Sequence, residues 1–229
     1  MDHRNIKDAL YTNFALIGKA LSNAKRLELI DLLAQGELSV EALSLKARLS
    51  VGNTSAHLKT LYAARLVDRR KVGQHVFYYL ASPHVFQLFR GVQAVAEEQI
   101  AEVSQILHRY YEARDELEPI TADELIGRMK DNEVLLIDVR PLDEFRSAHI
   151  AGAIPLPICD LEKRIEELPK DKEIVAYCRG RYCLYAVEAV EALRAHGFSA
   201  KRLTAGVPDW RELGLPVNTN STLDLNKIL

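Results

Sequence analysis

Residues 173–197 read EIVAYCRGRYCLYAVEAVEALRAHG. The apolar run Ile174–Tyr177 predicts a short buried strand, which ends at Cys178. Residues 179–183 follow as a loop, and apolar positions at helical spacing then predict an amphipathic helix that closes at Gly197. A thiol between a strand end and a helix start lies where backbone N–H groups and the helix dipole favour an anion.

Two arginines give this loop its charge. Arg179 and Arg181 place two positive charges beside Cys178. Positive charge and a helix N-terminus both favour the thiolate over the thiol. We therefore expect a lowered pKa for Cys178 and a site that holds a negatively charged adduct on its sulfur.

Strand and helix patterns alternate around this stretch. Residues 134–137, VLLI, form a continuous apolar run, which is typical of a parallel strand covered on both faces. Thr121 is the predicted N-cap of a helix over 122–130. The other predicted elements are a short helix from Pro141, a turn and short strand over 149–156, a helix over 160–168, a strand over 201–203, a last helix near Leu213 and a loose polar tail from Val217. The alternation predicts an α/β domain with a parallel sheet.

The sequence of the first half of the chain indicates mainly helices. Apolar spacing indicates helices over 5–21, 24–34, 40–46 and 52–64, and Ser39 and Ser50 are predicted N-caps of the last two. Two short helices joined by a tight turn are the layout of a helix-turn-helix, whose second helix is the reader. Its polar side chains can reach base edges or phosphates, and they are Asn53, Ser55, His57, Lys59 and Thr60. Simple solvation is the alternative interpretation of His57.

A hairpin and a long helix follow the reader helix. The β-rich runs 66–72 and 75–80 flank a Gly73-Gln74 turn, and the basic residues Arg69, Arg70 and Lys71 are expected at the tip. A basic tip is typical of a wing that lies along the phosphate backbone of DNA. The alternative interpretation is an exposed hairpin turn without a binding role. A helix from Pro83 to about residue 114 carries an apolar stripe that a second copy of the chain would cover.

The segment LSVGNTSAHLKTLYAARLV, at 49–67, resembles the winged helix-turn-helix of ArsR/SmtB-type bacterial repressors, and the likeness extends over about residues 10–110. The resemblance implies a homodimer, formed through the helices of this half, that binds operator DNA and releases it when a ligand binds. The helix before the reader has no cysteine, and His108 with Glu112 is a weak ligand set, so we predict no metal site. Gly52 and Ala56 stand where relatives often have proline and histidine.

The second half, about residues 119–217, resembles a single-domain rhodanese. The motifs are LIDVRPLDEF, HIAGAIPLP, YCRGRYC and LTAGVPDW. The resemblance implies that Cys178 accepts a sulfane sulfur and that the residues after it wrap the persulfide, namely Arg179, Gly180, Arg181, Tyr182 and Cys183. It also implies structural roles for Asp138, Arg140 and His149. Ala148 and Val207 replace glycines that the family usually has.

Loop length separates two kinds of chemistry. Related phosphatases and arsenate reductases have a loop one residue longer that closes with arginine, whereas Leu184 stands at that place here. The six-residue loop favours sulfur over a larger tetrahedral oxyanion, and phosphate or arsenate chemistry remains the alternative.

The two other cysteines each have two interpretations. Cys183 is either a resolving thiol, which would attack a Cys178 persulfide, or a small apolar residue in the first turn of the helix. Cys159 is expected to be plain packing at a helix start.

Composition points to a soluble protein of a reducing compartment. The 229 residues carry a net charge of −2, and seven Lys or Arg against one acid lie between Lys46 and Lys71, which favours a polyanion there. Three cysteines do not suggest a disulfide framework. The N-terminus has no secretory h-region and no stretch approaches 18 apolar residues, so we expect a cytoplasmic protein with no membrane partner and no cofactor.

The sequence therefore predicts two domains, an α+β winged helix-turn-helix over 1–113 and an α/β rhodanese-like domain over 119–217, joined by a linker at 112–120. Two functions remain open. The first is a transcriptional regulator, expected to be a repressor, that senses or transfers sulfane sulfur through Cys178. The second is a sulfurtransferase whose DNA-binding half localises or dimerises it. Its partners would be a donor such as thiosulfate, polysulfide or persulfide, and a thiol acceptor. A metal-responsive repressor is a third reading, without visible ligands.

Overall fold

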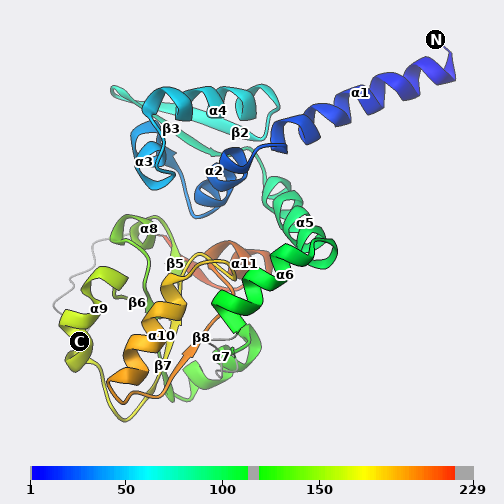
Figure 1. The fold of residues 1–229 in the computed structure, drawn as a ribbon. Helices are drawn as coiled ribbons and strands as arrows, with labels where there is room; N and C mark the ends of the chain where they lie inside the picture. Colours follow the sequence, from blue (N-terminus) through cyan, green and yellow to red (C-terminus); the bar gives the residue numbers. More distant parts are fainter. Residues whose placement is uncertain (1, 113–118, 220–229) are drawn as a thin grey trace. The chain divides into compact units, whose positions relative to one another are not determined.

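The computed structural model describes residues 2–112 and 119–219 (Figure 1). Internal contacts divide the chain into two units, Met1–Ala96 and Glu97–Leu229. Residues 113–118 of the predicted linker, and the predicted tail from residue 220 onward, lie outside the described residues.

The first unit is a helical domain with a small antiparallel sheet of order β1-β3-β2. Its elements are α1 (His3–Leu21), α2 (Ala24–Ala34), β1 (Leu38–Ser39), α3 (Val40–Lys46), α4 (Val51–Ala63), β2 (Val67–Val72) and β3 (His75–Leu80). Both predicted N-caps are confirmed: the Ser39 hydroxyl accepts a hydrogen bond from the Ala42 N–H and the Ser50 hydroxyl from the Asn53 N–H, each at 3.2 Å. Leu29, Ile30, Leu43, Leu58 and Leu61 are fully buried in the core.

The predicted hairpin is confirmed, with one addition and one correction. Gly73 and Gln74 form its turn, and Gly73 has the positive φ of +60° that a tight turn favours. Strand β1 was not predicted; it is two residues long and pairs Leu38 with Tyr78. The basic residues are not at the tip as predicted, because Arg69 to Lys71 pair with Tyr78 to Val76 along β2.

The single helix predicted from Pro83 to residue 114 is wrong. The structure has α5 (Pro83–Gln99), α6 (Ala101–Leu107) and the π-helix η1 (His108–Glu112). Ile100 is extended, with φ −112° and ψ 102°, and its carbonyl begins the new helix by accepting from the N–H of Val103. The Ser104 hydroxyl donates to the Glu97 carbonyl at 2.9 Å, which satisfies one group at the interrupted end.

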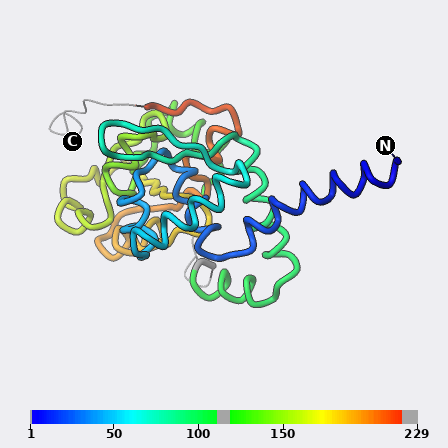
Figure 2. Tube along the Cα trace, turned by 90° about the horizontal axis from the view of Figure 1, so that it is seen from above, coloured from blue at the N-terminus to red at the C-terminus, as the bar shows by residue number. Residues whose placement is uncertain are grey.

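The second unit contains a parallel sheet of order β6-β4-β7-β8. The strands are β4 (Val134–Asp138), β6 (Ile154–Pro155), β7 (Glu173–Tyr177) and β8 (Ala200–Arg202). The helices are α7 (Ala122–Lys130), α8 (Leu142–Ser147), α9 (Ile158–Arg164), the 3-10 helix η2 (Ile165–Glu167), α10 (Tyr185–Ala195) and α11 (Val207–Glu212). The α/β prediction is confirmed. Figure 2 shows the course of the Cα trace, coloured from the N-terminus to the C-terminus.

Strand β7 shows that the sheet is buried on both faces. Ile174 and Ala176 join one apolar core with residues of α9 and α10, and Cys178 belongs to the same cluster. Val175 and Tyr177 join the other core with residues of α7 and α11. The continuous apolar pattern of the strand follows from these two cores.

The predicted loose tail is wrong at its start. Val217–Asn218 form β9, which pairs antiparallel with β5 (His149–Ile150). This pairing joins residues nearly 70 positions apart, so local polarity does not reveal it.

Candidate active site and nucleic-acid interface

The cysteine loop follows β7 directly, as the sequence predicts. Cys178 is 1% exposed, and its thiol donates a hydrogen bond to the carbonyl oxygen of Cys183, 3.3 Å away. The Cys183 N–H in turn donates to the Gly180 carbonyl at 3.1 Å. Gly180 has φ +121°, a conformation that favours glycine, so the chain can fold back over the sulfur.

The two thiols of the loop have pKa values shifted in opposite directions. Burial raises the pKa of Cys178 well above that of an ordinary thiol, and its hydrogen bond with Cys183 adds to the increase. The hydrogen bond from Cys178 lowers the pKa of Cys183 to about 7, with further help from the backbone N–H groups of Arg179 and Tyr185. The expected lowering of the Cys178 pKa is therefore wrong for the unmodified loop, in which Cys183 is the more acidic thiol.

The loop arginines explain part of this difference, because carboxylates hold both of them. Arg179 donates to Glu144 of α8 through Nε at 2.9 Å and Nη2 at 2.6 Å. Arg181 donates to one oxygen of Glu97 at 2.6 Å, and the Tyr182 hydroxyl donates to the other at 2.9 Å. Glu97 is the first residue of the second unit. Each positive charge is thus offset by a negative one, which weakens the field at Cys178.

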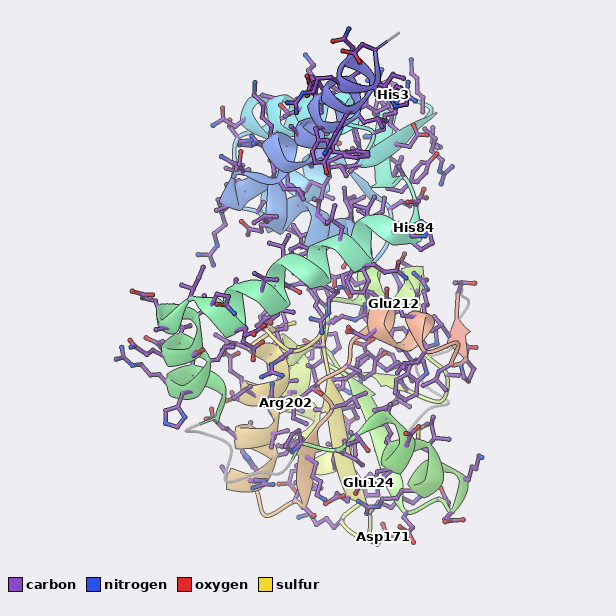
Figure 3. The ribbon with its side chains drawn as sticks, turned by 90° about the vertical axis from the view of Figure 1, so that its right-hand side faces the viewer. His3, His84, Glu124, Asp171, Arg202 and Glu212 are labelled. Atoms are coloured by element: carbon purple, nitrogen blue, oxygen red, sulfur yellow. The ribbon has the colours of Figure 1, made fainter. Side chains whose placement is uncertain are left out.

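Backbone N–H groups and a third arginine also contact the loop. The N–H groups of Gly180 and Ala186 hydrogen-bond to the Cys178 sulfur, which favours its charged form. Arg202, at the end of β8, is 5% exposed and donates to the Arg181 carbonyl at 3.4 Å (labelled in Figure 3). Arg202 was not among the predicted site residues, and the only sequence signal for it is a charged residue at the end of a predicted strand.

The motif TAGVPDW packs against the back of the loop. A Cβ on Gly206 would lie 2.6 Å from the carbonyl carbon and oxygen of Arg179, so only glycine fits this approach. The Asp209 carboxylate accepts from the Gly206 N–H at 2.8 Å. Val207, which replaces the usual second glycine, is fully buried. The motif therefore fixes the position of the loop.

Asp138, Arg140 and His149 form a buried framework beside the strand ends. The predicted ion pair is present, with Arg140 Nη2 2.6 Å from Asp138 Oδ2, and Arg140 also donates to the Ala148 carbonyl. Tyr177 donates to the same Asp138 oxygen at 2.6 Å. The His149 ring stacks on Phe145 with centroids 3.8 Å apart, and its Nδ1 lies 2.9 Å from the Phe145 carbonyl oxygen. These contacts tie β4, β7 and the turn at His149 together.

Cys159 does not pack as predicted. It is exposed on α9, whose buried residue is Leu161, two positions further on. A two-residue step on a helix turns a side chain by about 200°, which accounts for the opposite orientation.

The reader helix α4 presents its predicted polar side chains on two flanks. Asn53, His57 and Thr60 share one flank by helical spacing, and Ser55 and Lys59 share the other. Thr54, Leu58 and Leu61 form the buried face between them. Asn53, Lys59 and Thr60 are exposed, whereas Ser55 and His57 are half-buried.

The basic residues of β2 face opposite sides of the hairpin. The Arg69 guanidinium lies over the Tyr62 ring, 4.7 Å from its centroid, which links the strand to α4. Arg70 points the other way and forms an ion pair with Glu37. Arg69 and Lys71 therefore share one exposed face of β2, and Arg70 has a partner within the domain.

Two helices of the first unit expose apolar side chains in rows. Ile6, Leu10 and Phe14 form an exposed row at helical spacing on α1, which projects from its unit in Figure 1, and Tyr11 is exposed beside this row. Leu88, Val92 and Val95 are exposed on α5. Rows of this kind are typical of a surface that another chain covers.

The described ranges 2–112 and 119–219 contain neither a membrane-spanning helix nor a cluster of metal ligands. No helix there is long and apolar enough to cross a bilayer. Within the same ranges, no three His, Cys, Asp or Glu side chains come together as metal ligands.

Each half of the chain matches a known protein family. Residues 23–69 match the family model of the bacterial regulatory proteins of the arsR family, and residues 121–213 match that of the rhodanese-like domain. The chain is 43% identical over 212 residues to the HTH-type transcriptional regulator Rv0324 of Mycobacterium tuberculosis, and the alignment covers 93% of each protein. The chain belongs to the arsR family of bacterial regulatory proteins. Both resemblances drawn from the sequence are confirmed.

This arsR-family regulator carries its rhodanese-like domain behind the winged helix-turn-helix. The domain is similar to a sulfurtransferase of Allochromatium vinosum, with 34% identity over 43% of this chain and 92% of that protein. Among solved structures, a homodimeric winged helix-turn-helix fragment from Mycobacterium bovis is 40% identical, with a TM-score of 0.41, and covers 44% of this chain and 91% of its own.

Proposed function

We propose that this regulator is a repressor that binds operator DNA as a homodimer and takes up sulfane sulfur as a persulfide on Cys178. The observation that carries the proposal is one chain with two complete sites. The first unit has a reader helix with polar, exposed flanks and a basic wing strand. The second has a buried thiol at a strand end, within a six-residue loop.

Sulfur uptake is a nucleophilic substitution at sulfur. The Cys178 sulfur attacks the outer sulfur of thiosulfate, the S–S bond of the donor breaks, and sulfite leaves with the electron pair. Polysulfides and low-molecular-weight persulfides are donors of the same chemistry. The attack needs the Cys178 proton removed, and the Cys183 thiolate, already hydrogen-bonded to that thiol, accepts it. The N–H groups of Gly180 and Ala186 then favour the persulfide anion.

Sulfur loading regulates DNA binding only if the loaded and unloaded states differ in their free energy of binding DNA. The test is a mobility shift of operator DNA with wild type, Cys178→Ser and Cys159→Ser, with and without thiosulfate. Thiosulfate should change the affinity of wild type and of Cys159→Ser, and leave Cys178→Ser unchanged. Cys159 is the matched control because it is an exposed cysteine outside the loop. Equal affinities with and without the donor would reject sensing.

Homodimerisation is supported by the exposed apolar rows on α1 and α5. A second copy of the chain supplies the same rows, so each can cover the other. The family model adds that relatives of this domain are bacterial regulatory proteins.

The alternative is a sulfurtransferase whose DNA-binding half localises or dimerises it. The complete cysteine loop favours this function as well, because the persulfide can pass to a thiol or to cyanide. Thiocyanate production from thiosulfate and cyanide, dependent on Cys178, would support the enzyme. The mobility shift separates the two functions, since a pure transferase has no reason to change its affinity for DNA.

A further inference from the structure

Two thiols contact each other within the loop. The Cys178 sulfur lies 3.3 Å from the Cys183 carbonyl oxygen, and the two side chains also hydrogen-bond to one another. Both cysteines are free. Their exposure differs, since Cys178 is 1% exposed and Cys183 is intermediate.

The loop also brings the Cys178 sulfur close to the backbone of Cys183. A carbonyl oxygen is about 2.4 Å from the Cα of its own residue, by standard bond lengths and angles. The 3.3 Å contact therefore places the Cys178 sulfur within about 6 Å of the Cys183 Cα. The hydrogen bond between the two side chains brings one thiol against the other.

We propose that Cys183 is a resolving thiol that attacks the Cys178 persulfide, leaving a Cys178–Cys183 disulfide and releasing hydrosulfide. This inference rests on the proposed persulfide, and it adds a second step and a second product. The loop then stores the arrival of one sulfane sulfur as a disulfide.

The two steps balance without an added oxidant. In the first, Cys178 gains the outer sulfur of thiosulfate and sulfite leaves with the electron pair of the broken S–S bond. In the second, the Cys183 sulfur bonds to Cys178 Sγ, the persulfide S–S bond breaks, and hydrosulfide leaves with its electron pair. The two thiols are oxidised and lose their protons to solvent and to hydrosulfide. The sulfane sulfur is reduced, and it is the oxidant.

Acidity and position both suit Cys183 to the second step. An attacking thiol works best when its pKa is near the ambient pH, and that of Cys183 is about 7. Cys178 is buried and bonded to backbone N–H groups, so the persulfide forms next to Cys183. Cys183 is partly exposed, and it passes the proton taken from Cys178 to solvent before it attacks. A loop with the Cys178–Cys183 disulfide cannot accept another sulfur until a thiol reduces that disulfide. The domain therefore takes up one sulfane sulfur for each reduction of the disulfide.

The test uses the full-length, reduced protein under anaerobic conditions, with one to ten equivalents of thiosulfate. Intact-mass spectrometry, sulfite and sulfide are measured together. Wild type and Cys159→Ser should become about 2 Da lighter and release about one sulfite and one sulfide per chain. Cys183→Ser should become about 32 Da heavier and release sulfite without sulfide. Cys183→Ala should reach the same end mass, so the result does not depend on the serine hydroxyl, although both variants should load sulfur more slowly because they lack the Cys183 base.

Three outcomes have distinct meanings. A wild type that keeps a stable gain of about 32 Da and releases no sulfide overturns the resolving step and leaves the Cys178 persulfide in place. Sulfide release from Cys183→Ala at the wild-type rate overturns it as well. No sulfite and no mass change in any variant overturns the persulfide itself, and the proposed function with it.

Discussion

Both oxygens of the Glu144 carboxylate accept hydrogen bonds from Arg179, at 2.6 and 2.9 Å, and Glu144 is only 3% exposed. The pair joins α8 to the cysteine loop across 35 positions of sequence. Removing one partner of a buried pair leaves the other charge without compensation, which costs far more than losing an exposed pair.

Glu144→Gln should therefore lower the free energy of unfolding of the second unit by about 3 kcal/mol. Urea unfolding followed by the fluorescence of Trp210 measures it, because the chain has one tryptophan and it lies in that unit's core. Glu167→Gln is the control, since the Arg164–Glu167 pair lies at the surface and should contribute under about 1 kcal/mol. Equal losses in the two variants would contradict a buried pair.

The alkylation rate of Cys183 should rise with pH through a midpoint near 7. The thiolate is the nucleophile, and a lowered pKa moves its formation to lower pH, so the rate falls as pH drops below 7. The measurement uses iodoacetamide and peptide mass spectrometry in a Cys159→Ser background, which removes the exposed cysteine. In Cys178→Ala the hydrogen bond is gone, and the midpoint should move upward. A midpoint unaffected by Cys178→Ala would show that the two thiols are not paired.

Gly206→Ala should slow persulfide formation more than tenfold and lower the melting temperature. The Cβ of the alanine would lie 2.6 Å from the Arg179 backbone, which cannot relieve the clash by changing rotamer as a side chain can. Gly127→Ala is matched to it, because a Cβ at this helical position of α7 meets nothing within 4 Å. That control should be neutral or stabilising by up to about 1 kcal/mol. Sulfite release and thermal unfolding report the two effects.

Lys71→Ala should weaken DNA binding at every sequence and reduce the slope of log affinity against log salt by about 1. Lys71 is exposed on the face of β2 that it shares with Arg69. Lys170→Ala, an exposed lysine of the second unit, removes the same charge and should leave the slope unchanged. A slope that falls equally in both variants would show a general charge effect and no contact by the wing.

Phe14→Asp should dissociate the dimer. Phe14 is 63% exposed in the apolar row of α1, where a second copy of the chain would bury it and a carboxylate would lose its hydration. Leu45→Asp places the same charge on α3, at a leucine that is 81% exposed and outside the rows. Sedimentation velocity should show monomers for Phe14→Asp and dimers for Leu45→Asp. A wild type that is already monomeric would contradict the proposed interface.

Local signals predicted the helices well. The helices Ala24–Ala34, Val40–Lys46 and Ala122–Lys130 have the predicted bounds, since N-caps and apolar spacing lie within each segment. The break at Ile100 and strand β9 were missed because both depend on groups outside the segment. Propensity cannot encode such contacts.

At the site, too, features set by local sequence were predicted and features set by distant residues were not. The loop residues were identified from their order, yet the partners of the arginines were not, because Glu144 and Glu97 are 35 and 84 positions away. The pKa of Cys178 was predicted to be lowered because the prediction used only the charges within the loop. Burial and the contact between Cys178 and Cys183 instead raise the pKa of Cys178 and lower that of Cys183.

The pairing of β5 with β9 limits where the chain can be cut. A rhodanese-like fragment ending near Leu213 would include all four predicted motifs and yet lack Val217–Asn218, leaving the backbone groups of His149 and Ile150 without their strand partner. Fragments for expression should therefore extend beyond residue 218.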